Sequence, residues 1–221
     1  MNSNSKKTLV VTSALCALLA VGGTVAYFTD RDDAVNKIDI GQVKIDLTEP
    51  EWDASPDDNG DTIPDDAEDV VPTQEITKDP MVTNKGVNDA YIYVSVSFPK
   101  ENIYTANTDG TKNAKAVTQL FTPGAIGADW TLLSSDTSDA KVNTYVYGYN
   151  KVVAPTASTS KLFETVTFCN AIEGQGLENT VQNINVKAFG IQSDNTGTMK
   201  EAYTKYINCL LYTSPSPRDR G

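Results

Sequence analysis

The sequence predicts an all-β fold, a jelly-roll-like antiparallel β-sandwich with one or two short helices. Segments rich in Thr, Val, Ile and Tyr alternate between apolar and polar residues, which is the period of a half-buried strand. These segments are short and are separated by turn residues, a spacing typical of sandwiches and jelly rolls. Between them lies no long amphipathic segment that could form the helical crossover of a parallel sheet.

The elements are predicted in chain order from this alternation. Val35–Leu47 is one long strand or two, with Gly41 marking a bulge or turn. Glu49–Val70 is rich in Asp and Pro and is predicted to be a loop. Further strands are predicted at Glu75–Thr77, Met81–Asn84, Ala90–Phe98, Trp130–Leu133, Asn143–Tyr149, Lys151–Val153, Phe163–Cys169 and Val181–Ile191. Short helices are predicted at Ala114–Leu120 and Met199–Ile207.

Residues 1–26 have the features of a secretory signal peptide. Two lysines precede an apolar run, Leu9–Val21, that is too short to span a membrane comfortably. Small residues follow, which suits cleavage between Ala26 and Tyr27. We therefore expect a protein secreted to the extracellular matrix or cell surface, which contacts the membrane only through its uncleaved signal. A leader that stays uncleaved as a membrane anchor is the alternative.

The other end of the chain, Cys209–Gly221, resembles a translated sequencing adapter. It contains two Ser-Pro pairs and no alternating apolar pattern. We expect this tail to be non-native, and residues 27–208 to form a single β-sandwich domain in which residues 49–70 are an acidic loop. A native disordered tail is the alternative.

Charge and composition exclude several classes of function. The formal net charge is −11, and such an acidic chain repels nucleic acid and attracts divalent cations. The chain has no histidine, which excludes Ser-His-Asp and Cys-His catalysis and HExxH zinc hydrolases. We therefore expect no catalytic residues and no enzyme activity. Cys169 lies in a strand pattern and is predicted to be a buried thiol, with intermolecular pairing as the alternative.

One acidic segment has the spacing of metal ligands. Asp57, Asn59 and Asp61 fall at positions 1, 3 and 5 of a twelve-residue calcium loop. The full candidate ligand set is Asp57, Asn59, Asp61, the carbonyl of Ile63, Asp65 and Glu68. Thr62 stands where glycine usually makes the sharp bend of such a loop. Calcium is therefore the expected cofactor, and a merely solvated acidic loop is the alternative.

Several segments together resemble a known family. Thr24–Asp30 resembles the signal class that is processed by the SipW-type signal peptidase of Gram-positive bacteria. The further matching segments are Asp39–Asp46, Lys78–Val94, Pro155–Val166 and Ile184–Gln192. Together they resemble the TasA/camelysin family of secreted bacterial surface and biofilm-matrix proteins. The resemblance implies a jelly-roll domain and, for the matrix members, assembly into extracellular fibres. Some members carry a metallo-endopeptidase label, for which this sequence offers no ligands.

The expected function is structural: self-assembly into fibres by β-strand addition. Strand addition needs an unpaired sheet edge and an extended donor segment. Ile38 and Ile40 lie in the expected donor, Tyr27–Ile40, whereas the apolar residues after Gly41 are expected to pack in the subunit's own sheet. The alternative is a monomeric surface module that binds polysaccharide or a host ligand. Its face would be the acidic loop or the strand tyrosines, which are Tyr91, Tyr93, Tyr104, Tyr145, Tyr147 and Tyr149.

Overall fold

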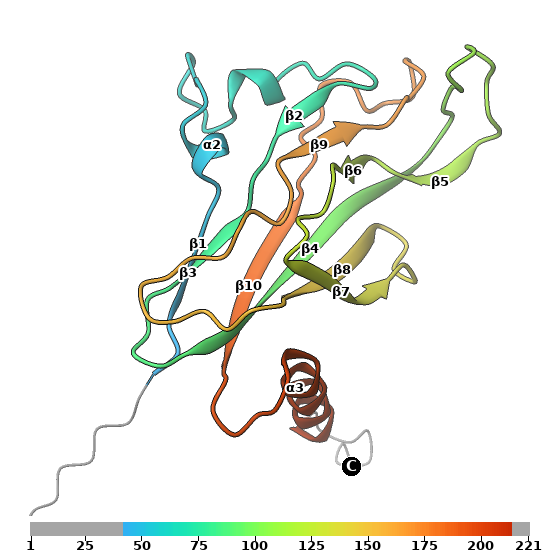
Figure 1. The fold of residues 1–221 in the computed structure, drawn as a ribbon. Coiled ribbons are helices and arrows are strands. Elements are labelled where there is room, and N and C mark those ends of the chain that lie inside the picture. Colours follow the sequence, from blue (N-terminus) through green and yellow to red (C-terminus); the bar gives the residue numbers. More distant parts are fainter. Residues whose placement is uncertain (1–41, 214–221) are drawn as a thin grey trace, which may run out of the picture. The chain divides into compact units, whose positions relative to one another are not determined.

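The strands of this protein form three antiparallel sheets in a computed structural model that describes residues 42–213 (Figure 1). The chain divides into two units, residues 1–40 and residues 41–221, and all described residues belong to the second. The expected signal-peptide cleavage site at Ala26 and Tyr27, and the proposed donor residues Ile38 and Ile40, therefore lie outside the described residues.

The largest sheet has the strand order β10-β4-β8-β7, with β5 paired to the far end of β4. Its strands are β4 (Ala90–Ile103), β5 (Ala116–Gln119), β7 (Trp130–Asp136), β8 (Val142–Tyr149) and β10 (Asn185–Gln192). The central strand β4 pairs with β10 on one side and with β8 on the other. The order therefore leaves β10 and β7 at the two edges of the sheet.

Two smaller sheets complete the sandwich. Their strands are β1 (Ile45–Thr48) with β3 (Met81–Asn84), and β2 (Glu75–Thr77) with β9 (Thr165–Phe168) and β6 (Phe121–Pro123). The described residues also contain α2 (Pro50–Asp53) and the 3-10 turn η1 (Asp65–Ala67), which lie between β1 and β2, and α3 (Met199–Thr213), which follows β10. Among residues 42–213, none of the helices is both long and apolar enough to cross a membrane. The prediction of an all-β antiparallel sandwich with short helices is confirmed.

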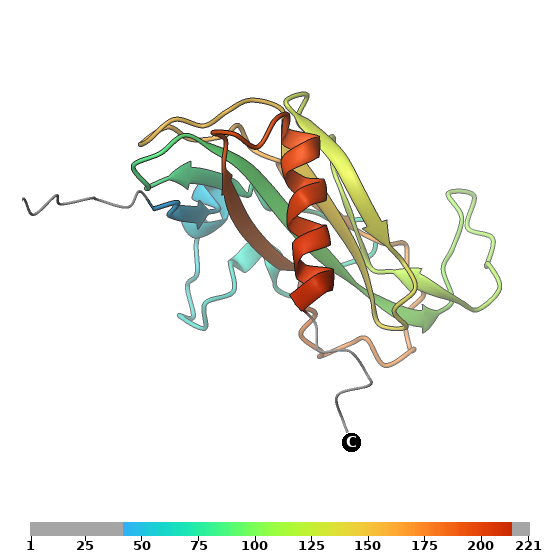
Figure 2. The same cartoon turned by 90° about the horizontal axis from the view of Figure 1, so that it is seen from below.

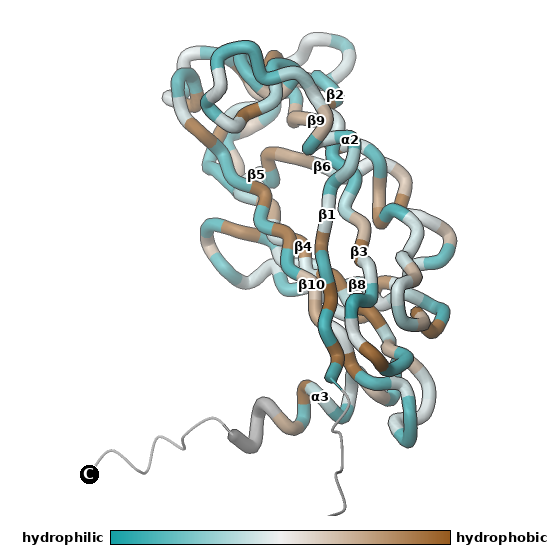
Figure 3. Tube along the Cα trace, turned by 90° about the vertical axis from the view of Figure 1, so that its left-hand side faces the viewer, coloured by the Kyte–Doolittle hydropathy of each residue, from teal (hydrophilic) through white to brown (hydrophobic). Residues whose placement is uncertain are grey.

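The core lies where alternate side chains of β4 meet the smaller sheets. Ile92, Val94, Val96 and Phe98 are fully buried on one face of β4, as the period of two requires. The Phe98 ring lies 6.5 Å from that of Phe163, which precedes β9, so the contact joins the two sides of the sandwich. Hydrophobic and hydrophilic residues accordingly alternate along the strands in Figure 3.

The helix α3 covers part of the opposite face of the main sheet (Figure 2). Tyr93 projects from this face, stacks on Phe189 of β10 at 4.9 Å, and lies 5.7 Å from Tyr203 of α3. Its hydroxyl donates a 2.8 Å hydrogen bond to the carbonyl of Met199. A Cβ on Gly148 would collide with the Met199 sulfur, so the absence of a side chain there lets the helix approach β8.

Most element boundaries follow the alternation, and two helical predictions need correction. The strands β2 and β3 have the predicted bounds, whereas β4 continues past Phe98 to Ile103. The predicted helix at Ala114–Leu120 is wrong, because Ala116–Gln119 pairs with this extension of β4 as strand β5. A sheet partner outweighs weak local helix propensity. The second helix is present but runs to Thr213, well past Ile207.

Smaller differences concern the loops. The predicted loop over residues 49–70 contains α2 and η1. The predicted strand Lys151–Val153 contributes one bridge, between Val153 and Ala90. The strand β6 was not predicted, because its three residues are too few to show a period.

Candidate functional site

The candidate ligands of the acidic loop begin after α2 and extend through η1, and most of them bind the loop's own backbone. Asp57 accepts hydrogen bonds from the N–H groups of Gly60 and Thr62, at 2.7 and 3.0 Å. Asn59 accepts one from Asp61, and Asp61 accepts one from Ile63, each at 2.9 Å. These local bonds shape the turn, and the side chains of Asp57, Asn59 and Asp61 are exposed.

The last two side chains of the predicted ligand set, Asp65 and Glu68, close the loop from its far end. Asp65 accepts a 3.0 Å hydrogen bond from the backbone of Asp58, and Glu68 accepts one of 2.6 Å from the Asn59 amide. Loop positions 3 and 12 are therefore in contact. Within residues 42–213, no group of three or more His, Cys, Asp or Glu side chains is gathered closely enough to hold a metal ion. Asp57, Asn59, Asp61 and Asp65 thus accept backbone N–H groups, and Glu68 accepts the side-chain amide of Asn59.

Thr62 makes the bend that the sequence assigns to glycine. Its φ is +76°, in the left-handed region that glycine adopts without penalty, and Gly60 has the same φ. A β-branched residue in that region costs on the order of 1–3 kcal/mol unless other contacts hold it there. The hydrogen bond from Thr62 N–H to Asp57 is one such contact.

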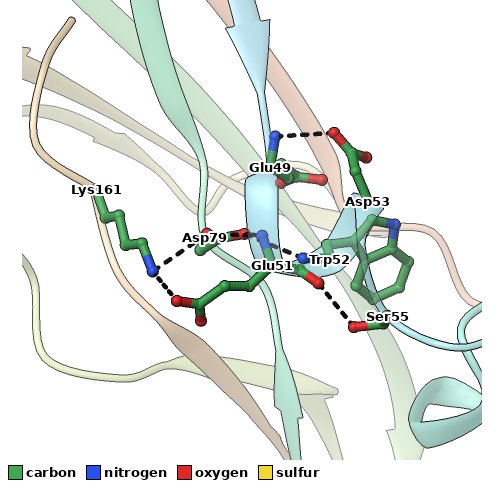
Figure 4. A network of polar contacts seen from close by, with 7 residues as sticks. All are labelled: Glu49, Glu51, Trp52, Asp53, Ser55, Asp79 and Lys161. Carbon is green, nitrogen blue, oxygen red and sulfur yellow. Dashed lines mark hydrogen bonds and ion pairs between the residues drawn. The ribbon is translucent and has the colours of Figure 1, made fainter.

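Asp79 fixes the segment that leads into this loop (Figure 4). Its carboxylate is fully buried between β2 and β3 and accepts hydrogen bonds from the backbone N–H groups of Glu51 and Trp52, at 3.1 and 3.2 Å. Lys161 lies 3.3 Å from the same carboxylate and also binds the carboxylate of Glu51. The hydrogen bond to Glu51, and then that to Asp79, raises the pKa of Lys161 above its usual value.

A second buried pair lies beside the first. Lys78 is only 7% exposed, forms a 2.7 Å ion pair with Glu49, and lies 4.6 Å from the centre of the Trp52 ring. A buried charge is tolerated when it is paired in this way. The second carboxylate oxygen of Glu49 is buried and has no hydrogen-bond partner among residues 42–213. Together the two lysines attach α2, and with it the start of the acidic loop, to the sandwich.

A groove of about 320 Å³ opens next to this network. On one side it is lined by the end of β1 and the residue after it (Leu47–Glu49). On the other side it is lined by the start of β10 and the residue before it (Ile184–Val186). Asp53 of α2 and Lys78, which follows β2, complete the lining. β1 pairs with β3, and β10 pairs with β4, so the groove separates the margins of two different sheets.

The segment of β1 that adjoins the groove packs as expected. Val43, Ile45 and Leu47 are partly buried against the core. A Cβ on Gly190 would stand 2.8 Å from Val43 Cγ1 and 3.2 Å from Ile45 Cγ2. The glycine therefore lets β1 lie close to β10.

The strand tyrosines are mostly structural. Tyr93, Tyr147 and Tyr149 are buried, and burial raises the pKa of Tyr93 and Tyr147. Tyr91 donates its hydroxyl to the carbonyl of Gly197, and Tyr104 lies under Lys112 with 3.6 Å between the ammonium and the ring centre. Cross-strand and helix packing accounts for their alternation.

Sequence analysis assigned no role to the buried polar residues Lys78, Asp79 and Asn84, although they belong to a segment that carries the family resemblance. Lys78, Asp79 and Asn84 are buried polar residues of the Lys78–Val94 segment. A charged pair directly before a strand-like segment was the one local signal for them. Their partners Glu49, Glu51 and Lys161 lie far away in the sequence, which no local pattern reveals.

The fold and the site define an all-β sandwich protein with an anchored acidic loop and a groove between two sheet margins. Comparisons of the chain with protein-family models, with curated proteins and with solved structures found no match.

Proposed function

We propose that this chain is a secreted structural protein of the bacterial cell surface or biofilm matrix, of the TasA/camelysin kind, and that it assembles into fibres by β-strand addition. The observation that carries the proposal is the groove between the end of β1 and the start of β10. Backbone groups at a sheet margin bind an extended segment of another chain in the way that they bind a neighbouring strand.

The edge strand β10 supports this assignment. Its eight residues pair with β4 in unbroken register, and Lys187 is its only charged residue. The opposite edge, β7, carries a bulge at Leu133 and ends at Asp136. Bulges and charges are the features that protect an edge from pairing with another chain. We therefore assign the acceptor margin to β10.

The donor in this proposal is Tyr27–Ile40 of a second copy, which contains Ile38 and Ile40. The same segment leads directly into β1, whose apolar side chains pack in the subunit's own core. A donor joined to a structured strand links consecutive subunits head to tail, and such contacts generate filaments when they do not close into rings. The partners are thus further copies of the chain and, during export, a SipW-type signal peptidase.

Calcium is proposed as the ligand of the acidic loop. The loop contains hard oxygen donors at the spacing of a calcium loop, and the Asn59–Glu68 hydrogen bond already joins positions 3 and 12. Binding requires that the ion replace backbone N–H groups as the partner of some carboxylate oxygens. Because Asp53 of the adjoining α2 lines the groove, an ordered loop would also steady one wall of the groove.

The two other candidate functions have weaker support. A monomeric module for polysaccharide or a host ligand would need exposed rings, and three of the six strand tyrosines are buried. A metallo-endopeptidase function follows from the family label alone, and we propose no enzyme activity. An acidic surface also disfavours nucleic acid as a partner.

The experiment introduces carboxylates along the N-terminal segment of the secreted protein. Ile38→Asp and Ile40→Asp should block fibres seen by electron microscopy while circular dichroism still reports a folded monomer. Lys37→Asp is the matched control, because it places the same group on the opposite face of the strand. Val43→Asp should instead unfold the domain, since a buried unpaired carboxylate is costly. Normal fibres from Ile38→Asp and Ile40→Asp would contradict the proposal.

A further inference from the structure

Three side chains meet beside the connection between β2 and β3, and the outermost, Glu51, is 60% exposed (Figure 4). The ammonium of Lys161 contacts the carboxylates of both Asp79 and Glu51. Asp79 is fully buried, and the Lys161 side chain is 27% exposed. We propose that Lys161 and Asp79 join in an intramolecular isopeptide bond, an amide between Lys161 Nζ and Asp79 Cγ, and that Glu51 carries the proton in its formation.

The backbone holds the two reacting groups side by side. The N–H of Leu162 donates a 2.9 Å hydrogen bond to the carbonyl of Pro80, so the residues next to Lys161 and Asp79 are paired directly. The distance from Nζ to the nearer carboxylate oxygen is 3.3 Å. Fixing reactants at such a separation replaces a bimolecular encounter by a step within one molecule, which is a large part of the acceleration in many enzymes.

The bond forms with loss of one water molecule. Lys161 Nζ attacks Asp79 Cγ, the new C–N bond forms, and one C–O bond of the carboxyl group breaks. The ammonium gives up two protons, and both leave with the carboxyl oxygen as water. The positive and negative charges of the pair disappear together, so the net charge of the protein is unchanged and no oxidant or co-reactant is required.

Glu51 and the backbone of α2 supply the catalytic groups. Hydrogen bonds to Glu51 and then to Asp79 raise the pKa of Lys161, so its amine becomes nucleophilic only when a base takes a proton. The carboxylate of Glu51, in contact with Nζ, is that base; it takes one proton before the attack and the second after it, and passes each to the leaving oxygen, which departs as water. The N–H groups of Glu51 and Trp52, at 3.1 and 3.2 Å from Oδ1 of Asp79, stabilise the oxyanion that forms on attack.

The other lysine–aspartate pair in the described residues is an internal control. Lys151 and Asp129 lie 2.7 Å apart, closer than Lys161 and Asp79. Their side chains are 62% and 34% exposed, however, and hydrogen bonds and ion pairs join Lys151 to no second carboxylate in the part of the chain that the structure describes. Lys151 and Asp129 should therefore form no amide bond, because the pair is more exposed and has no second carboxylate to carry protons.

The cross-link would act on stability and not on assembly chemistry, so it stands apart from the proposed fibre function. It joins the connection between β2 and β3 to the segment before β9. Covalent closure of a long loop restricts the unfolded chain, as a disulfide does. An amide is not cleaved by reducing agents, so this covalent cross-link would persist under conditions that break disulfides.

Peptide mapping by mass spectrometry of the full-length secreted protein tests the inference. The expected result of tryptic digestion is one species that joins peptides 79–85 and 152–187 and is lighter than their sum by one water, because an amide-linked Lys161 resists trypsin. Peptides 116–141 and 142–151, which hold Asp129 and Lys151, should appear separately. Lys161→Arg should abolish the joined species, and Glu51→Gln should slow its formation about a hundredfold or more, the contribution typical of general-base catalysis.

The wild-type protein also provides the result that would contradict the cross-link. Wild-type protein that yields free peptide 79–85, cleavage after Lys161 and no joined species would overturn the inference. Because this comparison uses the wild-type chain, it holds even if a variant fails to fold. A joined species that forms at the wild-type rate in Glu51→Gln would remove Glu51 from the mechanism.

Discussion

Asn84 Nδ2 donates a 2.8 Å hydrogen bond to the carbonyl oxygen of Val153, and both residues are almost completely buried. The same amide donates to the carbonyl of Asn88 at 2.9 Å, and its oxygen accepts from the N–H of Gly86 at 2.9 Å. One side chain therefore closes the turn after β3 and joins it to the segment that bridges to Ala90.

Replacing this amide by a carboxylate should be strongly destabilising. Asn84→Asp removes the donor of two hydrogen bonds and places a negative charge against two carbonyl oxygens. Each buried group left without its partner costs about 1–3 kcal/mol, so we expect the free energy of unfolding in urea to fall by at least about 2 kcal/mol. Asn107→Asp, at an exposed position, is the control and should change it by less than about 0.5 kcal/mol. Equal losses in the two variants would contradict the structural role of Asn84.

Because Gly190 has no side chain, Val43 and Ile45 can pack against β10, and a larger residue at this position should destabilise the fold. Gly190→Val adds atoms where Val43 and Ile45 already lie, and overpacking of this kind costs about 1–3 kcal/mol. Val43→Ala removes one of the colliding groups, so the double variant should recover part of the loss. A double-mutant cycle by urea unfolding measures this coupling. Strictly additive effects would show that the two positions are not in contact.

Calcium should stabilise the folded protein through the acidic loop. We expect a dissociation constant of about 0.1–1 mM, in the range of extracellular sites, because Thr62 replaces the usual glycine. Binding to the folded state alone adds about 2.7 kcal/mol at a hundredfold excess over that constant.

The loop variants separate calcium binding from loop structure. Asp57→Ala also removes backbone hydrogen bonds, so the informative quantity is the increase in Tm on adding calcium and not the Tm itself. That increase should vanish in Asp57→Ala and Asp61→Ala and persist in Asp58→Asn, which lies outside the ligand set. Titration calorimetry that detects no heat of binding at millimolar calcium would contradict the site.

Cys169 should react slowly while the protein is folded. Its side chain is half-buried, and burial raises the pKa of the thiol. A raised pKa means that less of the reactive thiolate exists at pH 8, so labelling by a disulfide reagent should accelerate as the pH rises toward that pKa and again on unfolding. The exposed Cys209 is the reference within the same chain. Equal labelling rates for Cys169 in native and denatured protein would contradict its burial.

The sequence predicts the parts of the fold that a period of two encodes. The buried face of β4 and the bounds of β2 and β3 follow from alternation, since burial on one face is what creates that pattern. The segment Ala116–Gln119 shows the limit, because its strand form depends on pairing with Lys100–Ile103, which lies elsewhere in the chain.

The candidate site shows the same limit. Asp57, Asn59 and Asp61 each accept a backbone hydrogen bond from a residue two or more positions later in the same loop, and such local contacts are of the kind that spacing within one segment can indicate. The contacts of Lys161 with Asp79 and Glu51 were not predictable, because the three residues come from segments that only the folded chain brings together. Helix α3 likewise continues beyond Asn208, a boundary drawn from composition. Whether the tail is native stays a prediction.

The most direct test of fibre assembly by strand addition is electron microscopy of two purified forms of the protein. One form begins at Tyr27 and the other at Gly41, and both retain Val43 and the strand β1. We expect fibres from the longer form and folded monomers from the shorter one, at equal concentration and with equal circular dichroism in the strand region. Fibres that persist in the form beginning at Gly41 would contradict donation of the N-terminal strand.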